Sequence, residues 1–488
     1  MKILVLQLAR FGDIYMTWPM LRALKRQNPQ SEIHVLVRKR FSDALIGLKA
    51  VDRVVVLPSQ SWAEALLQDT ESQDDDLVKS QAQVDDFLNT MKTEKYDKIV
   101  NVSFSPLSSY LTHALTTEQT DVVGYTRFQD GSFQCCDSIS LYFYDQVGED
   151  RPNRYHLTDM LSAMVDMDLI DADFRPPMQD FHLTHQCDPQ RTVLLHVGAS
   201  QRKKSLAGFQ WGRIVKSFLQ QCPEFEIALI GSSAEKYIAE EILAQNPGAP
   251  IKSFVGLTQV PQVFDLLKNS HSLMACDSMA IHMADLTHTP CFNLSFQSVN
   301  FWETGPLATG SVVHPVEKPE TINSLDVASK WACFVRGENV SDAFTTQKKL
   351  PRYSGMTSAS EDFQWQLLQA LYMNEPFPVA DDVLFCECID KIFQLNDIFI
   401  DNLKKIQKKS FRHDTFILNQ TENTMMSVGR FHPAAAVLLR WYRGKKIKVA
   451  PASQNEIISE YLKIHLEFRS ILKMYVWDES ESIDLKKE

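Results

Sequence analysis

Short aliphatic runs alternate with longer stretches of helical periodicity along the first part of the chain. Residues 2–8 are almost all aliphatic, which predicts a strand buried on both faces. Phe11-Gly12-Asp13 interrupts this pattern, and residues 13–26 then carry apolar positions at helical spacing. Further runs rich in β-branched residues follow at 33–37, 54–57 and 98–102. This alternation predicts a parallel sheet that is covered by helices on both faces.

A second series of the same kind begins after residue 190. Its aliphatic runs are residues 193–197, 227–231, 272–275 and 291–294. The stretch between the two series, residues 175–190, contains Pro176-Pro177 and few apolar positions, which indicates a linker. We therefore expect two Rossmann-like α/β domains that face one cleft. Ligands of such sheets bind outside the carboxyl ends of the strands.

The pattern changes after about residue 320. Long helical stretches with hardly any strand signal follow, among them residues 363–372, 383–407 and 454–474. We expect an N-terminal Rossmann-like domain, a C-terminal Rossmann-like domain and a helical extension, at residues 1–180, 181–320 and 321–488.

Composition narrows the class of protein. The 488 residues include 50 Lys and Arg against 61 Asp and Glu, a net charge of −11, and this argues against a nucleic-acid partner because phosphate binding needs a clustered cationic surface. Nine cysteines without a C-x₂-C repeat are typical of a reducing compartment. No signal peptide is visible, and no run approaches the ~20 apolar residues that span a bilayer, so we expect a cytoplasmic protein.

Asp13 is the first candidate for chemistry, because it lies at the start of the first predicted helix. A carboxylate there can cap the helix, since its oxygens accept hydrogen bonds from free amides and the helix dipole favours negative charge. It can also act as a general base toward an attacking hydroxyl at the mouth of a water-poor cleft. The residues alone leave both interpretations open.

The second candidate is the segment 196–205, which directly follows the strand that opens the second domain. It combines small residues, including Ser200, with the cations Arg202, Lys203 and Lys204. This composition suits an anionic group such as a diphosphate. An exposed basic loop would have the same composition, so this alternative stays open.

The third candidate is the segment 276–284, which again follows a strand and opens a helix. Asp277 and Ser278 stand at its N-cap positions, and His282 lies about one turn later. An anion at that helix end would meet free amides, a hydroxyl and an imidazole. The alternative for His282 is a histidine that is packed between helix and sheet.

Other signals do not make a site. Two D-x-D pairs, at 166–168 and 171–173, are similar to the pair that holds a divalent ion in some transferases, but they fall in or just after a helical stretch and are interpreted as chance. The H-x-x-H at 182–185 lacks further ligands apart from Cys187, so no metal site is predicted. The absence of G-x-G-x-x-G and of G-x-x-x-x-G-K-[ST] argues against a dinucleotide oxidoreductase and a P-loop enzyme.

Taken together, the three clusters resemble the ADP-heptose:lipopolysaccharide heptosyltransferases, family 9 of the glycosyltransferases. KILVLQLARFGDIYMTWPMLRAL is similar to that family's strand, Gly-Asp turn and helix with an early proline, here Pro19. HVGASQRKKSLAGFQWGRIV is similar to its small-residue strand end followed by a Lys and a Trp, here Trp211. DSMAIHMA is similar to its Asp-Ser/Thr-Gly-x-x-His segment, with Met279 in place of the Gly. The resemblance extends from residue 1 to about 310.

The resemblance implies a GT-B fold with an acceptor domain first and a nucleotide-sugar donor domain second. It implies an inverting, metal-independent glycosyltransferase without a cofactor. The transferred sugar, heptose for example, would pass from a nucleotide-diphosphate sugar to a saccharide, a lipopolysaccharide-type glycolipid or a protein. In this interpretation Asp13 is the general base and Arg10 contacts the acceptor. The residues expected to bind the donor are Ser200, Lys203, Lys204, Glu235, Asp277, Ser278 and His282.

Two points stay open at this stage. One is whether the chain is instead a non-catalytic sugar-nucleotide or glycan-binding protein on the same fold; Met279 favours this alternative, whereas Asp13 speaks against it because a pure binder needs no base. The other is whether two basic stretches, residues 404–412 and 440–448, are solvated helix faces or contact anionic lipid. The expected location is therefore cytoplasmic, either free or peripheral on the inner face of the cytoplasmic membrane.

Overall fold

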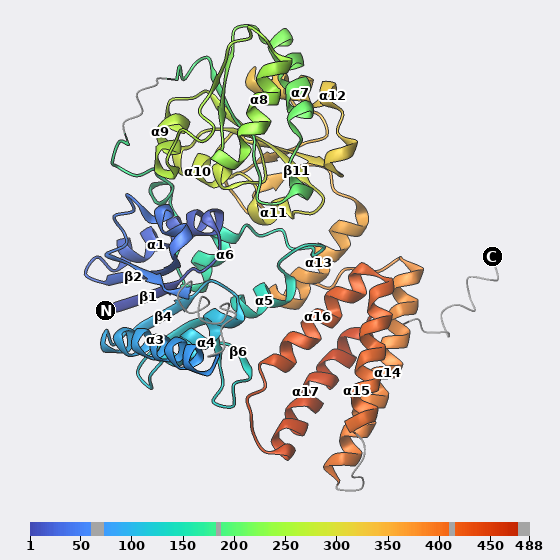
Figure 1. Cartoon of the computed structure of the whole chain (residues 1–488). Coiled ribbons are helices and arrows are strands. Elements are labelled where there is room, and N and C mark those ends of the chain that lie inside the picture. Colours follow the sequence, from blue (N-terminus) through green and yellow to red (C-terminus); the bar gives the residue numbers. More distant parts are fainter. Residues whose placement is uncertain (60–72, 182–186, 409–414, 477–488) are drawn as a thin grey trace, which may run out of the picture. The chain divides into compact units, whose positions relative to one another are not determined.

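The computed structural model describes residues 1–59, 73–181, 187–408 and 415–476 (Figure 1). It divides into two compact units. Unit 1 comprises Met1–Tyr125, Gly148–Asp150 and Arg154–Met356, and unit 2 comprises Thr126–Val147, Arg151–Asn153 and Thr357–Glu488. This division differs from the three ranges expected from the sequence, because unit 1 holds two sheets and continues past residue 320, while residues 126–147 belong to unit 2.

The first sheet of unit 1 is parallel, with strands paired in the order β3-β2-β1-β4-β5. The strands are β1 Lys2–Leu6, β2 Glu32–Arg38, β3 Arg53–Leu57, β4 Lys98–Asn101 and β5 Asp121–Arg127. Leu4 and Leu6 belong to one apolar core, and the alternating Ile3 and Val5 are also fully buried. The central strand β1 is therefore buried on both faces, as its aliphatic run predicts.

Helices cover both faces of this sheet. They are α1 Phe11–Gln27, α3 Gln73–Thr93, α4 Pro106–Leu115 and α6 Leu157–Met164, with a short 3₁₀ turn, η1, at Lys39–Leu45. Helix α1 packs on α6, and α3 packs on α4, on opposite faces of the sheet (Figure 1). Because β1 leads directly into α1, the start of this helix lies at the carboxyl edge of the sheet.

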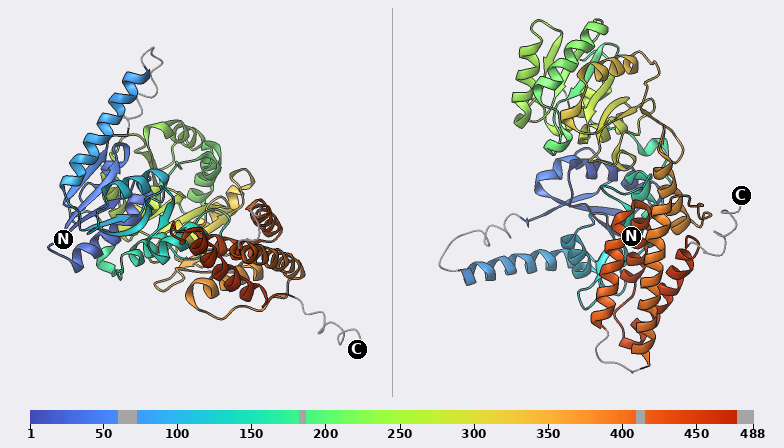
Figure 2. Two further views of the ribbon diagram at one scale, coloured as in Figure 1. Left: turned by 90° about the horizontal axis from the view of Figure 1, so that it is seen from below. Right: turned by 90° about the vertical axis from the view of Figure 1, so that its right-hand side faces the viewer.

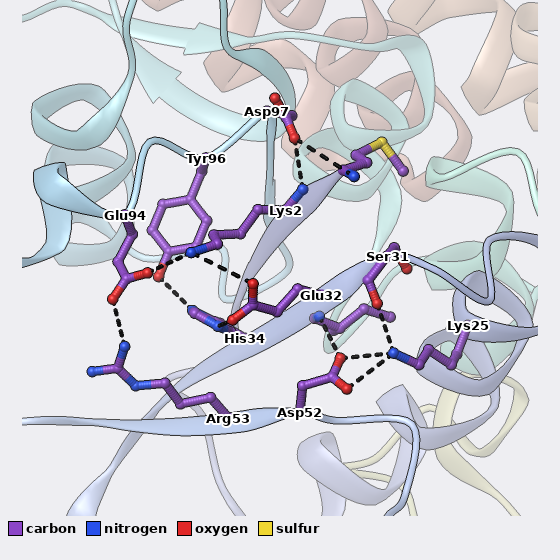
Figure 3. Close-up of polar contacts among 12 residues, drawn as sticks. Lys2, Lys25, Ser31, Glu32, His34, Asp52, Arg53, Glu94, Tyr96 and Asp97 are labelled. Atoms are coloured by element: carbon purple, nitrogen blue, oxygen red, sulfur yellow. Dashed lines mark hydrogen bonds and ion pairs between the residues drawn. The ribbon is translucent and has the colours of Figure 1, made fainter.

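The amino edge of the same sheet is held by paired charges (Figure 3). Lys2 and Arg53 both contact Glu94, at 2.7 and 2.5 Å, and Lys25 contacts Asp52 at 2.8 Å. Lys2, Asp52 and Arg53 stand at the starts of strands, and Lys25 and Glu94 stand at the ends of helices, so this network stabilises the end of the sheet that faces away from the strand-to-helix turns.

The second sheet of unit 1 has the order β14-β13-β12-β11-β10-β7-β8-β9. Its strands are β7 Thr192–His196, β8 Glu226–Ile230, β9 Ile251–Ser253, β10 Ser272–Cys276, β11 Cys291–Phe296, β12 Val312–Val316, β13 Phe344–Thr346 and β14 Tyr353–Ser354. All neighbours pair in parallel except at β13 and β14, which are antiparallel. The four expected runs are confirmed as strands. The sequence interpretation missed β9, which has three residues, and the β13–β14 pair, which lies beyond residue 320, and it also missed the five-residue strand β12.

Helices again flank the second sheet. They are α7 Gly208–Gln221, α8 Lys236–Gln245, α9 Val263–Lys268, α10 Met279–Thr287, α11 Phe301–Thr304 and α12 Ser324–Val335. Trp211 is fully buried in the core on the side of α7 and α12, where Phe218 stacks on Trp331 with ring centroids 3.8 Å apart. Two parallel sheets with flanking helices confirm the expected α/β class.

Unit 2 is mainly helical. Its elements are β6 Phe133–Cys135, α5 Ser138–Gln146, α13 Ala359–Met373, α14 Val383–Gln407, α15 Thr415–Val428, α16 Pro433–Ile447 and α17 Gln454–Leu472. Helices α14, α15, α16 and α17 lie side by side (Figures 1 and 2). Between them, buried His465 bonds to Asn396 at 2.6 Å and to the Tyr442 hydroxyl at 3.0 Å, so the polar atoms of this core are paired.

Three further observations bear on the sequence predictions. All nine cysteines lie in described segments, and none of them forms a disulfide there. None of the helices in the described segments is long and apolar enough to cross a bilayer. In the same segments, no group of three or more His, Cys, Asp and Glu side chains is arranged to hold a metal ion.

Candidate functional site

The starts of two helices, one from each sheet of unit 1, meet at Gly12. A Cβ atom on Gly12 would lie 3.1 Å from His282 Cδ2 and 3.8 Å from Met279 Cα. The absence of a side chain at residue 12 therefore lets α10 approach the first turn of α1. Both helices direct unpaired amides and the positive ends of their dipoles toward this junction, which is an arrangement that favours an anion.

Asp13 is the third residue of α1, and it does cap the helix. Its Oδ2 accepts a hydrogen bond of 3.0 Å from the Arg10 backbone amide. Within the described residues, Oδ1 has no hydrogen-bond partner, and the side chain is partly exposed. Capping thus occupies one carboxylate oxygen and leaves the other available for a proton transfer.

The loop after β7 reaches α1 through Arg10, whose Nη1 donates to Ser200 Oγ at 3.2 Å. Lys203, in a 3₁₀ turn at Arg202–Lys204, contacts both oxygens of Glu149 at 2.9 Å. Arg10 and Ser200 therefore meet beside the first turn of α1, whereas Lys203 is held by Glu149, and all three side chains are exposed.

Ser278 is the N-cap residue of α10, yet its side chain makes no capping hydrogen bond. Its Oγ is buried and, among the described residues, has no hydrogen-bond partner. An N-cap serine normally accepts an amide of the first turn, so this hydroxyl is free for a ligand.

Asp277 points to the sheet rather than to the helix end. Its carboxylate is 5% exposed and accepts hydrogen bonds of 3.2 and 3.3 Å from Ser295 Oγ. Burial raises its pKa to about 6, and the positive charge of Lys204 opposes that rise.

His282 is 7% exposed and faces Gly12. Its Nδ1 has no hydrogen-bond partner within the described part of the chain and lies 3.8 Å from Asp285 Oδ2. Asp285 is itself fixed, because its Oδ1 accepts the backbone amides of Leu307 and Ala308. The burial of His282 agrees with the alternative of a histidine that is packed between helix and sheet. Its unpaired Nδ1 also suits a ligand.

Glu235 lies beside the loop after β7. A Cβ atom on Gly198 would lie 2.5 Å from Glu235 Oε1, and one on Gly231 would lie 3.1 Å from its Oε2. The two glycines therefore make room for this carboxylate, which also accepts the backbone amide of Ser232. Glu235 therefore lies beside the loop that holds other residues expected to bind the donor. Its own role in binding stays a prediction.

Further polar side chains lie near the site; of these, His196 belongs to the candidate segment 196–205, and the others were not among the candidates. Buried atoms without hydrogen-bond partners in the described residues include His196 Nδ1, Asn293 Oδ1 and Ser298 Oγ, which lie in or just after β7 and β11. His196 ends β7, Ser278 and His282 follow β10, and Ser298 follows β11, whereas Asn293 lies within β11. Buried polar atoms are nearly always paired, so these atoms are candidates for contacts with water or a ligand. For Ser298, its place just after a strand was the only signal in the sequence.

His156 is a further residue that was missed. Its ring lies 6.5 Å from that of His282, between centroids, and burial lowers its pKa to about 3, so it is neutral. Nδ1 accepts the Thr158 amide, which leaves the proton on Nε2, where it donates to the Gly305 carbonyl at 3.0 Å. No motif in the sequence pointed to this residue.

The weaker sequence signals have local explanations where the structure describes them. Asp173, from the second D-x-D pair, is buried and pairs with Arg26 at 2.9 Å. The H-x-x-H at 182–185 and residues 409–412 of the first basic stretch lie outside the described residues. In the second basic stretch, Lys445 pairs with Glu467 at 2.9 Å and Lys446 pairs with Glu422 at 2.7 Å.

Comparisons with known proteins give likenesses among solved structures. No family model matches the chain, and no curated protein matches it. ADP-heptose LPS heptosyltransferase II of E. coli is 15% identical, with a TM-score of 0.48 over 69% of this chain and 99% of that chain. A glycosyl transferase family 9 protein of Veillonella parvula is 13% identical, with a TM-score of 0.47 over 68% and 91%. Heptosyltransferase WaaC of E. coli with ADP is 14% identical, with a TM-score of 0.48 over 67% and 98%. At these values the likeness concerns the fold and does not bear on what this chain binds.

Proposed function

We propose that the chain is an inverting glycosyltransferase that moves a sugar from a nucleotide-diphosphate sugar to an acceptor hydroxyl. The observation that carries this proposal is the junction of α1 and α10, where Gly12, the neighbour of Asp13 on α1, lies against His282 of α10, the helix that begins after Ser278. The resemblance of the three sequence clusters to family 9 glycosyltransferases supports the same reaction.

The donor diphosphate would lie at the start of α10. Cleaving a glycosyl phosphate leaves negative charge on the diphosphate, so the site must supply positive charge and hydrogen-bond donors. The first amides of α10, the Ser278 hydroxyl and the His282 imidazole would supply donors, and Lys203 and Lys204 would supply charge. These groups belong to the chain itself, so the proposed transfer needs no metal ion and no cofactor.

The acceptor would bind on the side of the first sheet. Its hydroxyl must attack the anomeric carbon from the face opposite the leaving group, so the base must come from across the junction. Asp13 fulfils this condition, because Oδ1 has no partner in the described residues while Oδ2 fixes the side chain on the Arg10 amide. Arg10, exposed beside it, would contact the acceptor.

The other donor contacts follow from their positions. Glu235, held beside Gly198, would bind the ribose, and Asp277 would contact the donor sugar once Lys204 is drawn to the phosphates. Ser200 would help to close the loop over the donor. We place the reaction in the cytoplasm, on a saccharide, glycolipid or protein acceptor.

A ligand screen tests this function. Thermal shifts should be measured with ADP-, GDP-, UDP- and dTDP-sugars and with NADH, and product analysis should follow for each sugar nucleotide that stabilises the protein. We expect stabilisation by one sugar-nucleotide class, with release of its nucleoside diphosphate. Stabilisation without turnover on any acceptor would favour a non-catalytic binding protein. Stabilisation by NADH alone would contradict both the glycosyltransferase and the sugar-nucleotide-binding interpretation.

A further inference from the structure

Helix α10 carries two buried ionisable side chains, His282 and Asp285, on one face. They stand three residues apart, a spacing that makes side chains neighbours on a helix. His282 is 7% exposed and Asp285 is 5% exposed. His282 Nδ1 and Asp285 Oδ2 lie 3.8 Å apart, and within the described residues neither atom has a hydrogen-bond partner.

The two nitrogens of His282 face different neighbours. A Cβ atom on Gly12 would lie 3.1 Å from His282 Cδ2 and 3.5 Å from Nε2, so this edge of the ring faces the first turn of α1. Nδ1 lies on the other side of the ring, toward Asp285. One nitrogen therefore faces the candidate site, and the other faces a carboxylate.

The backbone holds Asp285 in place. Its Oδ1 accepts hydrogen bonds of 2.6 and 3.0 Å from the amides of Leu307 and Ala308. Oδ2 is the oxygen nearer to His282, and a small rotation of the imidazole would let it accept Nδ1–H. A buried carboxylate is costly unless a nearby charge or hydrogen-bond donor compensates it.

The charge of Asp285 acts on four other titratable side chains, which are His156, Cys291, Arg352 and Tyr353. Three of the four are uncharged. Burial lowers the pKa of His156 to about 3. Burial raises the pKa of Cys291 and that of Tyr353 well above their ordinary values, and the charge of Asp285 adds to both rises. These three groups supply no positive charge to Asp285.

Arg352 is a cation, but another acid already engages it. Its Nε and Nη2 donate to the two oxygens of Asp159 at 2.8 and 2.5 Å. A guanidinium that binds a carboxylate through two such bonds is compensated there. Among the described side chains around Asp285, His282 is therefore the one that can take up a compensating proton.

We propose that Asp285 is a positioning residue for His282. Its Oδ2 accepts Nδ1–H and directs Nε2 to the site, and binding of the anionic donor draws a second proton from solvent onto Nε2. The imidazolium then donates Nε2–H to the diphosphate while Asp285 balances its charge. This inference rests on the proposed function, because it couples donor binding at that site to proton uptake.

Asp285→Asn tests the pair with little change of shape. The carbonyl oxygen of asparagine can keep the two backbone amides, while its NH₂ group replaces Oδ2 and donates to His282 Nδ1 instead of accepting from it. The control is Asp265→Asn on α9. Asp265 also accepts a backbone amide, that of Phe181 at 2.7 Å, and lies 3.9 Å from Lys268, three residues away.

The first readout is the tautomer of His282 in the full chain without ligand. NMR shifts of the imidazole nitrogens report it at mildly alkaline pH, and His282→Gln assigns the signals. We expect the proton on Nδ1 in the wild type and in Asp265→Asn, and on Nε2 in Asp285→Asn. An Asp285 that only held Leu307 and Ala308 would leave the tautomer unchanged. The same tautomer in the wild type and in Asp285→Asn would thus overturn the proposal, whether or not a nucleotide binds.

The second readout is proton uptake on binding of ADP or UDP, from calorimetric titrations in two buffers that differ in their heat of ionisation. We expect uptake in the wild type and in Asp265→Asn, and its loss in Asp285→Asn and His282→Gln. Affinity should fall by about tenfold or more in Asp285→Asn, because a charge-assisted hydrogen bond is lost. Equal uptake in all four proteins would overturn the proposal. A reversed tautomer in a protein that binds neither nucleotide would support the pair and count against the proposed donor site instead.

Discussion

At the scale of single residues, Asp13 combines a structural contact with the proposed chemical one. One carboxylate oxygen holds the first turn of α1 through the Arg10 amide, and the other has no partner among the described residues. An asparagine can keep the capping contact through its carbonyl oxygen, but it cannot take up a proton. The two roles can therefore be separated by substitution.

We predict that Asp13→Asn lowers turnover by ~10²- to 10⁴-fold, because a general base contributes a factor of this order. Affinity for the nucleoside diphosphate should stay within about twofold, since the diphosphate lies on α10, and calorimetric titration with ADP and UDP measures this. A variant that binds no nucleotide but keeps its residual turnover would show that Asp13 serves the donor rather than the acceptor.

Asp277 leads to a prediction about pH. Burial raises its pKa from 3.8 to about 6, so the folded chain holds this proton more tightly than the unfolded chain does. The contribution of Asp277 to stability therefore falls as pH rises from about 4 to about 6, and it is constant above that range. At neutral pH, the buried ionised side chain of Asp277 is expected to lower the stability of the protein without a bound donor.

We predict that Asp277→Asn removes this fall. Denaturant unfolding at pH 4.5 and 7.5 should show the variant gaining on the wild type at the higher pH by about 2 kcal/mol, because about one and a half pKa units of the shift lie above pH 4.5. Donor binding should weaken at the same time. If the difference between the two proteins is the same at both pH values, Asp277 is ionised throughout this range.

At the scale of elements, two helix contacts depend on a missing side chain. Gly12 lets α10 reach α1 in unit 1, and Gly444 lets α16 reach α5 in unit 2. A Cβ atom on Gly444 would clash with Asp145 Oδ2. The same carboxylate accepts a hydrogen bond of 3.0 Å from the Tyr372 hydroxyl. Helices α5, α13 and α16 therefore all contact Asp145.

We predict that Gly444→Ala destabilises the protein by about 1–3 kcal/mol, because the methyl group must displace a packed carboxylate. The cost should shrink in the Asp145→Ala background, where the methyl group has room. Denaturant unfolding of the wild type, both single variants and the double variant completes the cycle. Equal costs of Gly444→Ala in both backgrounds would mean that α16 moves away from α5 without resistance from Asp145.

At the scale of the whole molecule, segments far apart in the chain compete for the same charges. Lys203, which we propose as a phosphate ligand, is held by Glu149 at 2.9 Å, and both side chains are about half exposed. A diphosphate must replace Glu149 at this ammonium group. Exposed ion pairs contribute only about 0.2–1 kcal/mol, so the competition is mild.

We predict that Glu149→Gln tightens binding of the nucleoside diphosphate by up to about fivefold, the equivalent of ~1 kcal/mol. Lys203→Gln should weaken it, and the two changes together should equal Lys203→Gln alone. The effect should fade in high salt, which calorimetric titration at two salt concentrations can show. Weaker binding in Glu149→Gln would mean that this carboxylate supports the loop instead of competing with the ligand.

The sequence by itself determined the local elements and the candidate chemistry near them. Aliphatic runs such as residues 2–8 and 193–197 became buried parallel strands, because hydrophobic periodicity acts over a few residues. Asp13 and Ser278 were found for the same reason, since each stands at a strand-to-helix turn that the pattern reveals.

Only the tertiary structure decided which of these groups meet and which are already occupied. It brought His282 against Gly12, turned Asp277 into the sheet, paired Lys203 with Glu149 and placed His156 beside His282. It also showed that the chain after residue 320 adds β13 and β14 to the second sheet. Contacts between residues far apart in the chain depend on how sheets and helices pack. Side-chain burial and pairing then follow from that packing, which no local pattern of hydrophobic and polar residues encodes.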